Sequence, residues 1–167
     1  MTEAQIKQKK GEHPFGHAGQ LISLVAFMGA WAADSFFGHW STFLARFVPL
    51  GLRLALLVLC LSLAIALIRS AAAVHHVEGE SDHVVTTGAF GHVRHPIYLG
   101  VMLVYKGMAL ATASLLALGV LSCIFFYYNY IAQYEERVLT AHFGQAYGEY
   151  KARTPKWVPR LRGPANG

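Results

Sequence analysis

The step Arg94-His95-Pro96 lies where a polar segment meets an apolar one, and its residue types suit the binding of an anion. Proline favours the first position of a helix because its missing N–H would have no partner there. A helix start offers free amides and partial positive charge, and an arginine adds a planar fork that matches a carboxylate. We therefore expect an anion site here. The alternative is a helix-starting proline beside an arginine that only marks the cytoplasmic side of a membrane.

A second polar group, Glu135-Glu136-Arg137, comes at the predicted end of a later apolar helix. Acidic side chains oppose the helix dipole near a C-terminus, so they reduce stability unless a partner compensates them. Asn129, Gln133 and Glu136 fall at i, i+4 and i+7, which places them on one helical stripe. In lipid such a stripe faces protein or water. The pattern predicts the polar wall of a substrate site, and a solvated charge cluster is the alternative.

An aromatic stripe follows the proline, with Tyr98, Met102 and Tyr105 at helical spacing. Tyrosine faces attract cations, although the same spacing is also typical of core packing. Lys106 stands in the middle of this apolar helix, where a lysine costs about 2.5–3.5 kcal/mol on insertion scales. It either extends its ammonium towards the membrane surface or takes part in chemistry.

Neither a metal site nor a disulfide is expected. The histidines and acids between residues 75 and 92 match no metal-ligand spacing; they are His75, His76, Glu78, Glu80, Asp82, His83 and His92. Cys60 and Cys123 both lie inside apolar runs, so we expect two buried, reduced thiols that behave as small hydrophobic residues.

The composition indicates which elements must position these groups. Hydrophobic residues make up 54% of the 167 residues and charged residues 14%, against about 25% charged in ordinary soluble domains. Such hydrophobicity excludes disorder, and a net charge of +5 is too dispersed to form a basic face for nucleic acid. We therefore expect an all-α, polytopic integral membrane protein that forms a single membrane domain over residues 1–167.

Long apolar runs predict about four transmembrane helices. The N-terminal portion, 1–68, carries two runs of nearly 20 residues, 21–37 and 47–68, and a polar cytosolic loop follows over 69–96. Residues 97–167 predict a hairpin of helices and an amphipathic tail. The hairpin helices are expected over 97–111 and 115–134, and Phe143, Tyr147 and Tyr150 are expected on one face of the tail. Basic residues near both termini place these ends, and the site, in the cytoplasm.

Taken together, the segments TTGAFGHVRHPIYLG, EERVL and FGQAYGEYKARTPKWVP resemble the C-terminal half of the isoprenylcysteine carboxyl methyltransferase family, to which the phospholipid N-methyltransferases are related. The similarity extends over residues 85–159. It implies a membrane-embedded methyltransferase that uses S-adenosyl-L-methionine and has no Rossmann domain. A lipid-like acceptor would enter sideways between the helices.

The resemblance also implies roles for particular residues. The cofactor-binding residues would be Gly88, Phe90, His92, Val93, Arg94, His95, Tyr98, Glu135 and Glu136. From the charged groups and the polar and aromatic stripes themselves, we expect the catalytic residues to be Arg94, Glu136 and Arg137, and the substrate residues to be Asn129, Gln133 and Tyr105.

The acceptor decides what further chemistry is needed. A carboxylate is already ionised at neutral pH, a thiol must become a thiolate, and an ammonium must lose a proton to a base. Two arginines and no dedicated base in the motif favour an isoprenylcysteine-type carboxylate or a thiol, with the amine of phosphatidylethanolamine as the alternative. Two other interpretations remain open: a membrane sterol reductase that uses NADPH, whose tail is similar, and a membrane module without activity.

Overall fold

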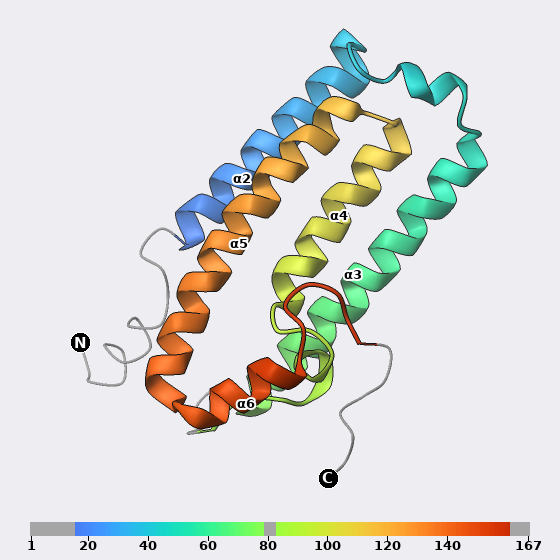
Figure 1. Ribbon diagram of the computed structural model, residues 1–167. Coiled ribbons are helices and arrows are strands. Elements are labelled where there is room, and N and C mark those ends of the chain that lie inside the picture. The colour runs from blue at the N-terminus through green and yellow to red at the C-terminus, as the bar shows by residue number, and fades with distance from the viewer. Residues whose placement is uncertain (1–15, 79–82, 161–167) are drawn as a thin grey trace. The chain divides into compact units, whose positions relative to one another are not determined.

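The computed structural model describes residues 16–78 and 83–160, and the side chains of 18–74 and 83–160. The described chain is all-α, as predicted (Figure 1). Its elements, in order, are α2 (Gly16–Ala32), the π-helix η1 (Ala33–Gly38), the 3-10 helix η2 (Phe43–Arg46), α3 (Leu50–Glu78), the 3-10 helix η3 (Gly88–Gly91), α4 (Pro96–Thr112), α5 (Leu115–Phe143) and α6 (Gln145–Arg153).

The helices are those of a multi-pass membrane protein. Within the described residues, three segments are long and apolar enough to cross a membrane, namely Ala18–Gly38, Leu50–Val74 and Leu115–Phe143. The shorter apolar helix α4 spans Pro96–Thr112, within one residue of its predicted bounds at each end. Its 17 residues extend about 25 Å at 1.5 Å per residue, somewhat less than a bilayer core of about 30 Å.

Two helices are longer than the sequence predicted. Helix α3 continues to Glu78, ten residues beyond the predicted end, into the segment expected to be a polar loop. Helix α5 continues to Phe143, although Glu135 and Glu136 were expected to end it. The acids can remain in a helix interior because both have partners from other parts of the chain.

The tail does not carry its three aromatic residues on one helix. Phe143 is the last residue of α5, Gly144 turns the chain with a φ of +55°, and α6 begins at Gln145. A positive φ is easily adopted by glycine and interrupts helical geometry. The expectation for Phe143 was therefore wrong, whereas Tyr147 and Tyr150 do share the buried face of α6.

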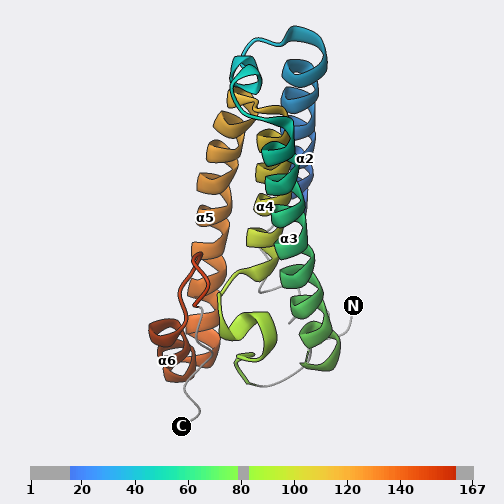
Figure 2. The same cartoon turned by 90° about the vertical axis from the view of Figure 1, so that its right-hand side faces the viewer.

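The described residues form two compact units. Unit 1 holds residues 65–78, 83–100 and 132–160, and unit 2 holds residues 16–64 and 101–131. In unit 1, α6 and the segment after it lie beside the turn that contains η3 and the start of α4 (Figure 2). All the candidate chemistry at Arg94 and Glu136 belongs to unit 1. The single membrane domain over 1–167 stays a prediction.

Unit 2 consists of closely packed apolar helices. Tyr105 of α4 is buried and stacks on Phe27 of α2, with ring centroids 4.3 Å apart. Gly107 allows α4 to approach α3, because a Cβ atom at this position would lie 3.0 Å from Cβ of Cys60. Large apolar side chains on the outer faces of these helices are exposed, which is typical of surfaces that contact lipid. Cys60 is buried as expected, but Cys123 is exposed, so the expectation for Cys123 was wrong.

Candidate active site

The site begins at a short turn that leads into α4. Gly88 has a φ of +55°, and the next amide, that of Ala89, donates a 2.9 Å hydrogen bond to Oγ of Ser70 on α3. A Cβ atom at Gly88 would lie 2.9 Å from Cγ2 of Val74, so only glycine fits against α3 without displacement. Val93 is fully buried. These contacts hold the turn, and therefore the start of α4 at Pro96, in one position.

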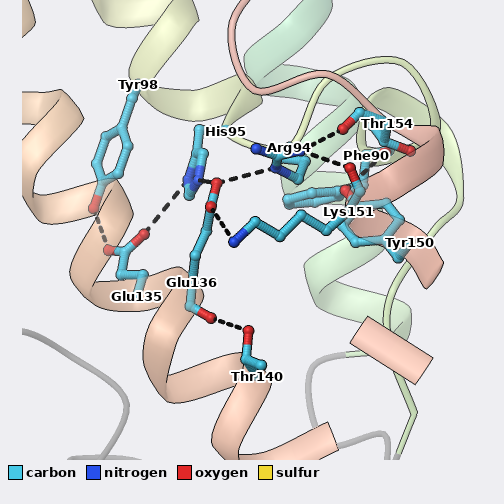
Figure 3. A network of polar contacts seen from close by, with 10 residues as sticks. All are labelled: Phe90, Arg94, His95, Tyr98, Glu135, Glu136, Thr140, Tyr150, Lys151 and Thr154. Carbon is cyan, nitrogen blue, oxygen red and sulfur yellow. Dashed lines mark hydrogen bonds and ion pairs between the residues drawn. The ribbon is translucent and has the colours of Figure 1, made fainter. Parts of the chain in front are cut away.

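Glu136 is the centre of an ion cluster in unit 1 (Figure 3). Its buried carboxylate accepts a hydrogen bond of 3.0 Å from Nε of Arg94 and one of 3.1 Å from Nε2 of His95. Nζ of Lys151 lies 3.4 Å from the other carboxylate oxygen. A buried acid requires such partners, because an unpaired charge in a low-dielectric interior is strongly unfavourable.

Glu135 lies beside this cluster and is more accessible. Its side chain is 27% exposed, against 6% for Glu136. The hydroxyl of Tyr98 donates a hydrogen bond to it, and its other oxygen lies 3.6 Å from Nδ1 of His95. Both ring nitrogens of His95 therefore face carboxylates, one from each glutamate.

The C-terminal tail is fastened to the start of α4 by both backbone and side-chain bonds. The amide of Arg94 donates to the carbonyl of Pro155 at 3.0 Å, and the amide of Arg160 donates to the carbonyl of His92 at 3.1 Å. Nη1 of Arg94 donates to the carbonyls of Lys151 and Thr154 at 2.9 and 2.6 Å. Arg94 therefore joins α4, α5 and the tail.

Aromatic rings extend the cluster on either side of His95. The His95 ring lies nearly parallel to that of Tyr98, with centroids 5.8 Å apart, and 5.6 Å from that of Trp157. Nζ of Lys156 lies 5.7 Å from the Trp157 ring. Burial lowers the pKa of Lys156, and the Glu136 charge acts in the opposite direction. The result is a row of π faces and cationic groups next to two carboxylates.

The two tyrosines of α6, Tyr147 and Tyr150, are both buried. The hydroxyl of Tyr150 donates a 2.8 Å hydrogen bond to the carbonyl of Phe90. Burial, with a smaller contribution from the Glu136 charge, raises the pKa of Tyr150 to about 12. Burial also raises the pKa of Tyr147. Both side chains therefore stay neutral at physiological pH, and Tyr150 remains a hydrogen-bond donor.

The structure brings together most of the residues that the resemblance assigned to the cofactor. Arg94, His95, Tyr98, Glu135 and Glu136 form one connected set of contacts. The remaining four lie in the adjoining turn, where Val93 is buried and Nδ1 of His92 lies 3.2 Å from the carbonyl of Gly88; these four are Gly88, Phe90, His92 and Val93.

Other predicted site residues lie elsewhere. Arg137 is exposed and forms no ion pair within the part of the chain that the structure describes. Gln133 is exposed although it shares a helical stripe with buried Glu136. Tyr105 and Asn129 belong to unit 2, where Tyr105 packs in the core. The assignment of Arg137 to catalysis and of the other three residues to the substrate stays a prediction.

Sequence reasoning missed several residues of the cluster, all of them in the tail or on α3. They are Ser70, Tyr150, Lys151, Thr154 and Trp157. Four of the five lie within the motif FGQAYGEYKARTPKWVP, so the motif already indicated the segment. No local pattern could assign their partners, because these lie more than a dozen residues away in the sequence.

The described side chains contain no metal centre. Side chains 18–74 and 83–160 include no group of three or more metal-ligating residues. The side chains of His75, His76, Glu78, Glu80 and Asp82 lie outside the described residues.

Comparison with known proteins assigns the chain to a family. Residues 49–146 match the family described as phospholipid methyltransferase, which covers more than half of the sequence and includes the whole segment from Arg94 to Glu136. The chain belongs to the phospholipid methyltransferase family. The motifs resembled the isoprenylcysteine carboxyl methyltransferases, and the family that matches is the related one. Membership implies S-adenosyl-L-methionine as the methyl donor and gives no support to a reductase.

The chain is also similar to parts of three characterised proteins. It is 39% identical over 69 residues to methanethiol S-methyltransferase 2 of Bradyrhizobium diazoefficiens, which covers 41% of this chain and 26% of that protein. It is 33% identical over 88 residues to the cobalt-zinc-cadmium resistance protein CzcN of Cupriavidus metallidurans, covering 52% and 40%. It is 30% identical over 83 residues to the nickel-cobalt-cadmium resistance protein NccN of Alcaligenes xylosoxydans xylosoxydans, covering 49% and 38%.

The chain therefore spans at most two fifths of the length of these relatives. No solved structure matches it significantly.

Proposed function

We propose that this protein is an integral membrane methyltransferase that transfers a methyl group from S-adenosyl-L-methionine to a small or lipid-like thiol. The observation that carries the proposal is the convergence of Tyr98, His95 and the two glutamates, from separate helices, in a member of the phospholipid methyltransferase family. The similarity to a methanethiol S-methyltransferase supports a thiol rather than a carboxylate as the acceptor.

The chemistry of the donor set fits the cofactor. Such a molecule carries an ammonium, ribose hydroxyls, an adenine ring and a sulfonium. The accessible carboxylate of Glu135 is suited to the ammonium or the ribose, since it can accept several hydrogen bonds. The rings of Tyr98 and Trp157 present π faces that attract a sulfonium or stack on a base.

In this proposal Glu136 has a positioning role and Glu135 has a ligand-binding role. Glu136 is already engaged by Arg94, His95 and Lys151, so it acts as a positioning residue that fixes the tail against α4. Glu135 accepts a hydrogen bond from Tyr98 and remains partly exposed, so it is the acid that contacts the ligand. Arg94 is likewise largely engaged within the chain, and the first turn of α4 offers amides for the ligand carboxylate.

In the proposed reaction the protein forms no covalent bond to either reactant. When bound, S-adenosyl-L-methionine would supply an electrophilic methyl group, and its sulfur would keep the bonding electrons as the methyl group is transferred to the acceptor. The chain must hold the two reactants in line, exclude water and complement the charge. A thiol acceptor must first lose its proton, and cationic groups such as Lys156 beside Trp157 favour the thiolate.

The amine of a phospholipid remains the second candidate acceptor, because the matching family is described by phospholipids. An ammonium has to be deprotonated before it can attack. Glu135, the accessible acid, would then be the base. The cationic residues of the tail support a site at the cytoplasmic face, by the positive-inside bias; they are Lys151, Arg153, Lys156 and Arg160.

The test uses the protein in nanodiscs. We expect S-adenosylhomocysteine to bind at micromolar concentration in calorimetry, NADPH not to bind, and labelled methyl to pass to a small or long-chain alkyl thiol. Glu135→Gln should weaken the binding of S-adenosylhomocysteine about tenfold or more, the cost of one charge-assisted hydrogen bond. Binding of NADPH alone would contradict the proposal, and methylation of phosphatidylethanolamine without thiol methylation would select the second acceptor.

A further inference from the structure

The connection between α2 and α3 exposes an unusual number of aromatic side chains. Within residues 36–47, five large rings face outward, three of them strongly: Phe37 is 82% exposed, Phe47 is 73% exposed and Trp40 is 69% exposed. The full set is Phe36, Phe37, Trp40, Phe43 and Phe47. We call these residues the aromatic loop. A connection that projects into water would be expected to carry polar residues instead.

A buried carboxylate holds the base of this loop. Asp34 of η1 has no exposed surface, and its carboxylate accepts bonds from the amide of Ser41 at 2.8 Å and from the hydroxyl of Ser41 at 2.5 Å. It also accepts a 2.5 Å bond from the hydroxyl of Ser114, which precedes α5. The loop is thereby tied to the turn between α4 and α5.

Ser41 and Ser114 also cap the start of α5. Oγ of Ser41 accepts a 2.7 Å bond from the amide of Leu116, and Oγ of Ser114 accepts a 3.1 Å bond from the amide of Ala117. Amides at the start of α5 thus donate to hydroxyls, and the hydroxyls donate to the acceptor-only carboxylate of Asp34. These bonds hold the backbone of Ser41, in the middle of the loop, against the start of α5.

The loop begins and ends at the boundary of a membrane. Its first residues finish the candidate span Ala18–Gly38, and three residues after Phe47 the candidate span Leu50–Val74 begins. Tryptophan is enriched in the head-group layer, where its amphipathic ring lies between water and the hydrocarbon core. Trp40 brings an indole N–H to this depth together with its apolar surface, which is the usual arrangement of tryptophan at such boundaries.

Cationic groups of unit 2 accompany the rings. The guanidinium of exposed Arg46 lies 5.6 Å from the centre of the Phe47 ring and donates from Nε to the carbonyl of Phe43. Lys106 is exposed on α4, six residues before the last residue of that helix, which is about 9 Å along its axis. A lysine at this depth can extend its ammonium towards phosphate groups at the surface.

We propose that the aromatic loop is a phospholipid-binding surface that lies flat in the head-group layer of the membrane. Its rings enter the region between the phosphates and the acyl chains, and Arg46 and Lys106 contact the phosphates. The partner is lipid rather than a second copy of this chain, because both ends of the loop are continuous with candidate membrane spans and the cationic Arg46 stands beside the exposed Phe47 ring. The residues of this surface belong to unit 2, whereas those of the proposed methyl-transfer site belong to unit 1.

The depth of Trp40 tests this proposal in nanodiscs. Subtracting the fluorescence of the Trp40→Phe variant from that of the unchanged protein isolates the emission of Trp40. We expect lipids brominated near the head group to quench this emission about twofold or more beyond lipids brominated near the chain ends, with little quenching by aqueous acrylamide. The Trp157→Phe variant, treated in the same way, serves as the matched control for a tryptophan outside the loop.

Two outcomes would overturn the proposal. Strong quenching by acrylamide without quenching by either lipid would place the loop in water. Quenching by none of the three would show that protein covers it. Should Trp40→Phe fail to fold, the Phe47→Trp variant provides a second tryptophan on the loop, and its added emission must show the same preference for bromines near the head group.

Discussion

The carboxylate of Glu136, in the interior of α5, lies 3.1 Å from Nε2 of His95 at the start of α4. Neither residue has appreciable exposure, so each supplies a polar partner that water cannot provide. Arg94 and Lys151 approach the same carboxylate, which makes one acid the meeting point of α4, α5 and α6. The geometry of the whole candidate site therefore depends on Glu136.

Glu136→Gln should reduce both stability and cofactor binding. The amide cannot balance Arg94, His95 and Lys151, and breaking a buried ion pair costs about 3–5 kcal/mol. Thermal unfolding in detergent micelles, together with calorimetry for S-adenosylhomocysteine, measures the two effects. Glu135→Gln is the matched control, because its partly exposed side chain should lose ligand affinity with at most about 1 kcal/mol of stability. Equal destabilisation by both variants would contradict the division of roles.

Tyr150 should make the protein sensitive to alkali. Its ordinary pKa of 10.0 is raised to about 12, so the folded state favours the neutral phenol. The corresponding stabilisation is complete below pH 10 and is lost as the pH rises to about 12, a change of about 2–3 kcal/mol. Tyr147 adds to this slope, since its pKa is also raised.

Tyr150→Phe provides the measurement. Below pH 10 the variant should be about 1 kcal/mol less stable, because the hydrogen bond to the Phe90 carbonyl is lost. Between pH 10 and 12 its free energy of unfolding should fall less steeply than that of the unchanged protein. Parallel slopes over this range would show that Tyr150 titrates normally.

Gly88→Ala should displace the turn before α4. Alanine disfavours a φ of +55°, and its Cβ would lie 2.9 Å from Cγ2 of Val74 and 3.0 Å from Oγ of Ser70. We expect a loss of about 1–3 kcal/mol in stability and weaker cofactor binding. Gly148→Ala is the control: it lies in α6 with nothing within 4 Å of the added atom, and it should gain up to about 1 kcal/mol.

Ala113→Gly should stabilise the hairpin between α4 and α5. Ala113 has a φ of +53°, and the amide of Ser114 bonds to the carbonyl of Ala109 as α4 ends. Glycine is preferred at such a helix terminus, so we expect a gain of about 1 kcal/mol in thermal or denaturant unfolding. Ala111→Gly, inside α4, should instead lose about that amount. A loss in both variants would show that flexibility outweighs relief of the left-handed conformation.

Several features followed from the sequence because their causes are local. The run 97–111 and its proline predicted α4 to within a residue, since apolar length and a missing N–H act on the segment itself. The turn after Thr112 followed for the same reason. The ordered motifs also indicated a related family, because they keep particular residue types in a particular order along the chain.

Tertiary structure alone decided how these residues are paired. The sequence placed both glutamates at the end of α5, whereas the helix continues to Phe143 because Arg94, His95, Tyr98 and Lys151 stabilise them there. From the sequence, the guanidinium of Arg94 was expected to be available for an anionic ligand. In the folded chain it donates instead to Glu136 and to carbonyls of the tail. Partners separated by 15 to 60 residues meet only when the helices pack. A pattern of nearby residues therefore cannot determine which of several polar groups becomes buried and which stays open to a ligand.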